Sequence, residues 1–202
     1  ANVPQGWKVW VTEYNLFENE GIVAGTWAHG LYAACQGMLL MTTPKTDLIC
    51  YHDISHGAQF GAIFNNNNGF NGFFKNKPTT ANAFSASGYT LQLIGEILKE
   101  KNEMAPLHFS NTIPTKINGN RIYPSLSGYI FNNKNKKGVL LFNLSGTKTS
   151  VDLTALNLPP TTFKQISSNP HTQVTESTDL NITSGNTGPI ITLEPYSITN
   201  LE

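Results

Sequence analysis

Side chains that can carry acid–base or nucleophilic chemistry follow two strand-like segments near the start of the chain. The segment WKVWVTE ends at Glu13, which Tyr14 and Asn15 follow, and the segment DLICY runs directly into His52 and Asp53. A carboxylate after an apolar strand is costly to bury unless partners hold it, and an ionised carboxylate can act as a nucleophile. The pattern therefore marks Glu13 as a candidate catalytic residue. The alternative is that Glu13 is a solvated residue that opens a loop.

Helix-like segments alternate with these strands. Residues 26–41 carry apolar side chains at helical spacing, with Thr26 as the predicted N-cap, and residues 81–101 repeat that spacing. The nearly continuous apolar run at 47–51 is typical of a strand covered on both faces. The order β-α-β-α predicts parallel strands, whose carboxyl ends meet at one edge of a sheet. We therefore expect Glu13 and His52 on adjacent parallel strands at the same edge.

The second half of the chain has a different pattern. Short alternating runs are separated by clusters of Asn, Gly, Lys and Pro, which predicts an antiparallel β-sandwich. The segment NNKNKK, residues 132–137, predicts a hairpin turn, and the Gly- and Asn-rich residues 56–77 also favour turns. Alternation predicts that Leu140, Phe142 and Val151 face the interior of the sandwich.

Composition and motif spacing argue against several classes of function. Lys and Arg balance Asp and Glu at 13 each, so there is no basic field for nucleic acid or an anionic membrane. No apolar run approaches the roughly 20 residues that span a bilayer. Cys35 and Cys50 lack metal or redox spacing and are expected to be buried free thiols. His52, Asp53 and His56 are a weak metal pattern, because adjacent strand residues point to opposite faces. We expect no metal and no cofactor.

Three segments together resemble one enzyme family. KVWVTEYN, residues 8–15, resembles the seventh barrel strand of clan A glycoside hydrolases, in which a Glu at the strand end is the nucleophile. GTWAHGLYAACQGMLL and then DLICYHDISHGAQFGAIF resemble the seventh helix and eighth strand of α-L-arabinofuranosidase-like members. ITLEPYSITNLE resembles the closing strand of their C-terminal sandwich.

The resemblance implies a fold class of α/β plus all-β. Residues 1–102 would be the C-terminal portion of a TIM-type barrel, holding the last two βα units of an incomplete (β/α)8 barrel, and residues 103–202 an antiparallel β-sandwich domain. Because two βα units cannot close a barrel of eight, we expect that an N-terminal barrel portion of the same protein is missing. The alternative is a small independent α+β domain whose strands join the sandwich sheet.

The resemblance also implies a retaining glycoside hydrolase of pentose-containing plant polysaccharides, arabinofuranosides or xylosides. Glu13 would attack the sugar, and a second carboxylic acid about 5–5.5 Å away would protonate the leaving oxygen. The family carries that acid on a Glu after an Asn at the fourth strand, which this chain lacks. Glu20 and Glu103 follow an Asn, but in a predicted loop and just past the second predicted helix. The isolated chain is therefore expected to be inactive.

Three residues next to Glu13 are expected to bind substrate or to support the nucleophile. Tyr14 and Asn15 follow Glu13 at the strand end, where functional side chains of barrels stand. His52 is expected to hydrogen-bond a sugar hydroxyl or to orient Glu13; the alternative is a core histidine that the backbone satisfies.

Two other functions compete with the hydrolase reading. A non-catalytic carbohydrate-binding or structural sandwich would need exposed aromatic rings for stacking, yet the second half of the chain has no Trp. A protein-interaction sandwich is neither supported nor excluded. If the substrate is a polymer, we expect a secreted or periplasmic protein.

Overall fold

The computed structural model describes residues 3–16, 22–56, 60–65, 78–110, 114–117, 121–133, 136–159 and 161–202. The chain forms two compact units. The first, here called the βαβ unit, comprises Ala1–Gln92 and Pro170–Asp179, and the second, here called the sandwich unit, comprises Leu93–Asn169 and Leu180–Glu202. The predicted domain division at residue 102 stays a prediction.

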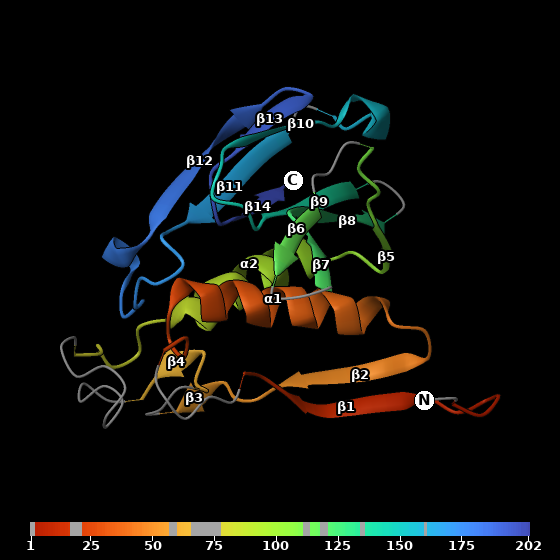
Figure 1. The fold of residues 1–202 in the computed structure, drawn as a ribbon. Helices are drawn as coiled ribbons and strands as arrows, with labels where there is room; N and C mark the ends of the chain where they lie inside the picture. The colour runs from red at the N-terminus through yellow and green to blue at the C-terminus, as the bar shows by residue number, and fades with distance from the viewer. Residues whose placement is uncertain are drawn as a thin grey trace. The chain divides into compact units, whose positions relative to one another are not determined.

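The βαβ unit is built on two parallel strands and a helix. Its elements are β1 (Val9–Tyr14), α1 (Trp27–Thr42), β2 (Thr46–Tyr51), β3 (Ser55–His56), β4 (Ile63–Phe64), the first part of α2 (Ala86–Leu98) and the short 3-10 turn Ser177–Asp179. β1 and β2 pair in parallel, with Val11 opposite Ile49 and Tyr14 opposite Tyr51, as the element order predicts. Helix α1 runs alongside this pair (Figure 1).

The N-terminus of α1 is capped by a distant segment of the same unit. Thr26 precedes the helix as predicted, but its hydroxyl donates to the carbonyl of Val23 at 2.6 Å and makes no side-chain cap. The backbone N–H groups of Trp27 and Ala28 instead donate to carbonyls in the segment 170–179, at 2.9 and 3.0 Å. The first amides of a helix have no partner within it, so these carbonyls replace a side-chain cap.

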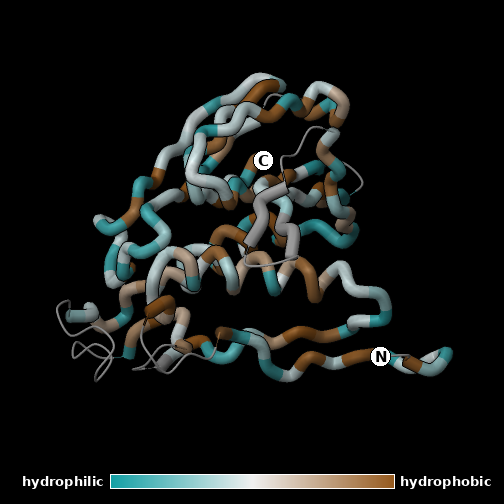
Figure 2. The backbone as a smooth tube through the Cα atoms, in the orientation of Figure 1, coloured by the Kyte–Doolittle hydropathy of each residue, from teal (hydrophilic) through white to brown (hydrophobic). Residues whose placement is uncertain are grey.

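One face of the β1–β2 pair is exposed. Trp10 and Leu48 lie opposite each other, and 66% and 42% of their surfaces are accessible, whereas the neighbouring pair Val11 and Ile49 is partly buried. Hydrophobic stretches are visible along both strands in Figure 2. The prediction that residues 47–51 are covered on both faces is therefore wrong in this structure. Among the described residues, α1 covers only one face.

The sandwich unit consists of antiparallel sheets, as predicted. Its strands are β5 (Glu103–Pro106), β6 (Pro114–Ile117), β7 (Arg121–Pro124), β8 (Leu126–Asn133), β9 (Lys136–Asn143), β10 (Thr149–Asp152), β11 (Thr161–Ser167), β12 (Asn181–Thr187), β13 (Ile190–Leu193) and β14 (Ser197–Leu201), with one 3-10 turn, Thr154–Leu156. Six of them form a sheet in the order β12-β11-β14-β9-β8-β5, and β10 pairs with β13. The core between these sheets contains Leu126, Val139, Leu141, Val151, Leu153, Ile191, Leu193 and Leu201.

The face assignment of β9 is corrected by the structure. Val151 belongs to the sandwich core as predicted, but β9 contributes Val139 and Leu141 to that core, so Leu140 and Phe142 lie on the opposite face of the sheet. They are nonetheless fully buried. The second half of α2 lies on their side of the sheet, because a Cβ on Gly138 would stand 3.0 Å from the side chain of Ile97.

Some predictions concern residues outside the described ones. Strands β8 and β9 pair as a hairpin, but residues 134–135 of the predicted turn are not among the described residues, nor are 57–59 and 66–77 of the Gly- and Asn-rich stretch. Cys35 and Cys50 are free thiols as predicted, though both retain partial exposure, and desolvation raises the pKa of Cys35 to about 12. Within the described ranges, no helix has the length and apolar character needed to cross a membrane.

Candidate active site

Glu13 and His52 lie at the same end of two hydrogen-bonded parallel strands, as predicted. Glu13 is the next-to-last residue of β1, and His52 directly follows β2, where its backbone N–H donates to the carbonyl of Tyr14 at 3.1 Å. The side chain of Glu13 is exposed and makes no hydrogen bond or ion pair within the described part of the chain. The ring of His52 is partly buried and packs against Phe60, with centroids 5.4 Å apart.

The carboxamide of Asn15 joins the ends of the two strands. Its Nδ2 donates to the hydroxyl of Tyr51 at 3.0 Å and to the carbonyl of Phe60 at 3.2 Å, and it also contacts the carbonyl of His52. The backbone N–H of Leu16 donates to its Oδ1 at 2.6 Å. Asn15 therefore connects β1 with the chain after β2.

A fifth residue of the site, His29, was not predicted. It lies in the first turn of α1 with 1% of its surface exposed, and its Nε2 is 2.7 Å from Asn15 Oδ1. The backbone N–H of Gly25 donates to its Nδ1 at 3.0 Å. Residues four and eight positions later, Ala33 and Gly37, are also buried. A polar residue on this small, apolar helix face was the available sequence signal.

Tyr14 points toward helix α1. A Cβ on Gly37 would stand 2.6 Å from the Tyr14 hydroxyl, so only glycine leaves room for it there. The Tyr14 and Tyr51 rings meet edge to face with centroids 5.6 Å apart. Burial raises the pKa of each hydroxyl to about 12. Tyr14 thus packs in the layer between strand and helix, where it supports the strand end.

Neither acidic residue considered from the sequence as the second acid is found at the strand ends among the described residues. Glu20 lies outside the described residues, and Glu103 opens β5 in the sandwich unit, so it does not stand at an end of β1 or β2. Asp53 follows His52, and its Oδ1 is buried without a hydrogen-bond partner among the described residues. Such an orphaned oxygen is uncommon in folded proteins. No group of three or more potential metal ligands occurs in the described ranges.

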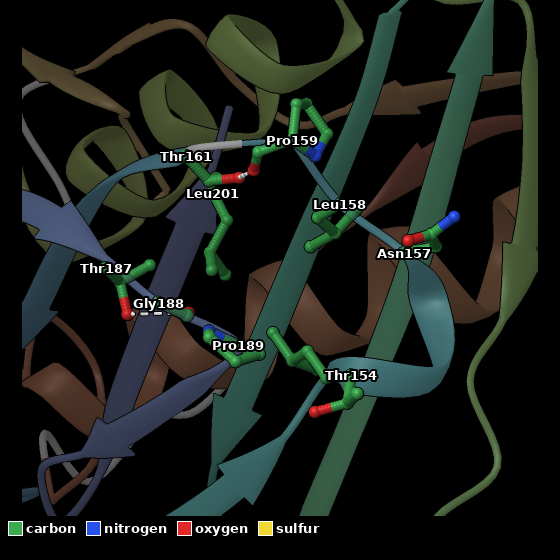
Figure 3. Close-up of a pocket in the computed structure, with 10 residues that line it drawn as sticks. Thr154, Asn157, Leu158, Pro159, Thr161, Thr187, Gly188, Pro189 and Leu201 are labelled. Atoms are coloured by element: carbon green, nitrogen blue, oxygen red, sulfur yellow. Dashed lines mark hydrogen bonds between the residues drawn. The ribbon is translucent and has the colours of Figure 1, made fainter.

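The sandwich unit contains a cavity of about 430 Å³ between strand ends and connecting loops (Figure 3). Its lining residues are Leu153, Thr154, Asn157, Leu158, Pro159, Thr161, Thr187, Gly188, Pro189 and Leu201. Sugar rings in binding modules stack on aromatic faces, and this lining offers only aliphatic and small polar groups. The cavity therefore gives no support to a carbohydrate-binding sandwich.

Comparison with solved structures places this arrangement among known folds. A family 30 subfamily 8 xylanase from Clostridium acetobutylicum matches with a TM-score of 0.58 and 14% identity, over 96% of this chain and 42% of the xylanase. A family 51 arabinofuranosidase from Xanthomonas axonopodis pv. citri matches with a TM-score of 0.60 and 14% identity, over 96% of this chain and 40% of that one. The fold of this chain is therefore similar to the part of each glycoside hydrolase that it covers.

A third match is a conserved exported protein from Bacteroides fragilis, with a TM-score of 0.62 and 13% identity over 96% of this chain and 38% of that protein. Identities this low show the fold alone, and at that level the predicted resemblance to clan A glycoside hydrolases is confirmed. The chain spans only about two fifths of the length of these structures. No protein-family model and no curated protein sequence matches the chain.

Proposed function

We propose that this chain is the C-terminal part of a retaining glycoside hydrolase that acts on arabinofuranosides or xylosides of plant polysaccharides. The observation that carries the proposal is the parallel pairing of β1 and β2, with Glu13 and His52 at one end of the pair. Functional side chains of α/β barrels stand at this end of their strands. The structural similarity to a xylanase and an arabinofuranosidase supports the substrate class.

The remainder of a barrel would explain the exposed face of the sheet. Trp10 and Leu48 are large apolar side chains, more than two fifths exposed, on strands that pair only with each other among the described residues. A contiguous apolar face and open strand edges favour association with further strands. We propose that six more βα units, carried by an N-terminal portion of the same protein, cover this face and complete the substrate pocket.

In this proposal Glu13 is the nucleophile of a double displacement. Its carboxylate forms a bond to the anomeric carbon as the glycosidic C–O bond breaks, and a carboxylic acid from the N-terminal portion donates its proton to the departing oxygen. The carboxylate left on that acid then takes a proton from water, whose oxygen bonds to the anomeric carbon as the bond to Glu13 breaks. The exposed carboxylate of Glu13 is open to a substrate, and His52 would hydrogen-bond a sugar hydroxyl beside it.

The chain alone is expected to hydrolyse no aryl arabinofuranoside or xyloside. Without the acid the leaving oxygen is not protonated, and without six of the eight βα loops the sugar ring is not held. The first measurement is the intact mass of the natural gene product, which should exceed the chain by roughly 200 residues or more. A natural product of the chain's own length would overturn the proposal. A polymer substrate further implies export from the cytoplasm.

The decisive experiment compares two Glu→Gln substitutions in the full-length protein. Glu13→Gln should lower kcat by at least about 10⁴-fold with the fold intact, because an amide cannot form the glycosyl-enzyme. Azide should partly restore cleavage of an activated substrate and give a product of inverted configuration. Glu103→Gln, at another exposed residue, in β5, is the matched control and should keep near-normal kcat. Near-normal kcat in Glu13→Gln would make Glu13 a structural residue.

A further inference from the structure

The hydrogen bonds of Asn15 fix the orientation of its carboxamide. Nδ2 faces oxygen atoms only, from the hydroxyl of Tyr51 and the carbonyls of Phe60 and His52. Because an amide nitrogen donates and an amide oxygen accepts, reversing the group would set an oxygen against three oxygens. The donors of Asn15 are therefore committed to the protein, and a sugar hydroxyl would have to compete for them.

His29 fixes the other side of the same group. The N–H of Gly25 donates to Nδ1 of His29, so Nδ1 is unprotonated in this arrangement and the ring proton of the neutral imidazole is on Nε2. That N–H lies 2.7 Å from Asn15 Oδ1 and donates to it. The resulting hydrogen-bond network connects His29 of α1, through the carboxamide of Asn15, to the ends of both strands. The side chain of His29 is almost entirely shielded from water.

We propose that Asn15 and His29 are positioning residues, which act as one unit to hold the Glu13 end of β1 against the His52 end of β2. This inference rests on the function proposed above. Glu13 is two residues before Asn15, and the carbonyl of His52 is a direct contact of its amide. Removing the bridge would let the two strand ends shift relative to each other, and a displacement of about 1 Å can lower the rate of a reaction about 100-fold.

The first test is Asn15→Asp in the full-length protein. The carboxylate places an oxygen where Nδ2 faced three oxygens, so we expect kcat to fall about 100-fold with KM changed less than about threefold. If Asn15 instead held the substrate by accepting a hydrogen bond, the aspartate would keep kcat, and KM alone would change. That outcome would overturn the positioning role.

His29 is tested with two variants of different hydrogen-bonding ability. His29→Leu removes the donor to Asn15, whereas the amide of His29→Gln can donate to Asn15 Oδ1 and accept from Gly25. We expect kcat to fall about tenfold or more in His29→Leu, with much of the loss recovered in His29→Gln. The combination of His29→Leu with Asn15→Asp should be little worse than Asn15→Asp alone, since both break one network. Equal kcat in the two His29 variants would contradict the inference.

Asn143→Asp is the matched control. Asn143 is buried, whereas Asn15 is partly buried; Nδ2 of Asn143 likewise donates to backbone carbonyls, those of Thr147 and Glu194 at 2.8 and 2.9 Å, and Asn143 belongs to the sandwich unit. This variant should lower the unfolding temperature as Asn15→Asp does, yet leave kcat within about twofold. A loss of kcat equal to that of Asn15→Asp would mean that any destabilisation slows the enzyme, and it would overturn the positioning role.

A readout without activity separates this inference from the proposed function. Nitrogen NMR of the 202-residue chain, assigned with the His29→Gln variant, should show His29 protonated at Nε2 and not at Nδ1. A proton on Nδ1 instead of Nε2 would remove the hydrogen-bond donor to Asn15 and would overturn the inference. If Glu13→Gln retains turnover, the proposed function fails, whatever the tautomer. If Glu13→Gln is inactive but Asn15→Asp keeps its kcat, only the positioning role fails.

Discussion

Gly88 in the first turn of α2 is the position where one added methyl group should do most damage to the βαβ unit. A Cβ there would stand 2.0 Å from the carbonyl oxygen of Ala62 and 2.9 Å from the ring of Phe84. The carbonyl cannot move freely, because it accepts hydrogen bonds from the N–H and the hydroxyl of Ser85, at 2.9 and 3.2 Å. The Ser85 hydroxyl in turn accepts from the N–H of Gly88.

Gly88→Ala sets two effects against each other. Alanine is favoured over glycine within a helix by about 1 kcal/mol. Overpacking costs about 1–3 kcal/mol, and a displaced carbonyl weakens two hydrogen bonds of about 1 kcal/mol each. The steric effect is the larger, so we expect a net loss of about 2 kcal/mol in the free energy of unfolding. Gly95→Ala in the same helix meets nothing within 4 Å and should instead stabilise by up to about 1 kcal/mol.

Tryptophan fluorescence during urea unfolding is the appropriate assay. All three tryptophans, Trp7, Trp10 and Trp27, belong to the βαβ unit, and Trp27 is fully buried. The signal therefore reports on the unit that contains Gly88. A Gly88→Ala midpoint at or above that of the unsubstituted chain would refute the reasoning.

Two further predictions concern the sandwich core and the tyrosine pair. Leu141→Ala, at a fully buried side chain, should lower the free energy of unfolding by about 3 kcal/mol in calorimetry, whereas Ile190→Ala at a 62% exposed side chain should change it by less than about 1 kcal/mol. Ultraviolet titration should show Tyr14 and Tyr51 ionising near pH 12, and each Tyr→Phe variant should remove one late-titrating group. Because burial raises both pKa values above 10, the stability that these hydroxyls contribute is complete below pH 10 and is lost between pH 10 and about 12. If Tyr51→Phe left the number of tyrosines that ionise near pH 12 unchanged, this assignment would be contradicted.

The order of elements could be predicted because its evidence is local. Apolar residues at helical spacing predicted 26–41 and 81–101, and the helices are Trp27–Thr42 and Ala86–Leu98. The alternation of strand and helix predicted the parallel pairing that brings Glu13 and His52 to one end of the sheet. Strand type and order follow from patterns within about ten residues, which a sequence displays directly.

The errors arise where a residue's environment is set by a distant element. Leu140 and Phe142 lie on one face of β9, as the alternation predicted, but both faces of this strand are buried. Hydrophobicity alone therefore does not show which face packs against the other sheet. Residues 47–51 were expected to be covered on both faces because they are apolar, yet Leu48 is 42% exposed, because coverage depends on which elements pack there. His29 meets Asn15 across 14 residues of sequence, and only the fold brings their polar atoms together.

The exposed carboxylate of Glu13 and the exposed apolar face of the sheet would be covered by the same additional strands. A carboxylate in open water is well solvated and reacts sluggishly, whereas the enclosed pocket of a hydrolase replaces that water with fixed hydrogen-bond donors. Trp10 lies three residues before Glu13 on the same strand, and its exposed surface favours burial against further strands. Strands added beside β1 would cover Trp10 and bring walls around Glu13 in the same step. In the proposed enzyme, the free energy that assembles the barrel therefore also encloses its nucleophile.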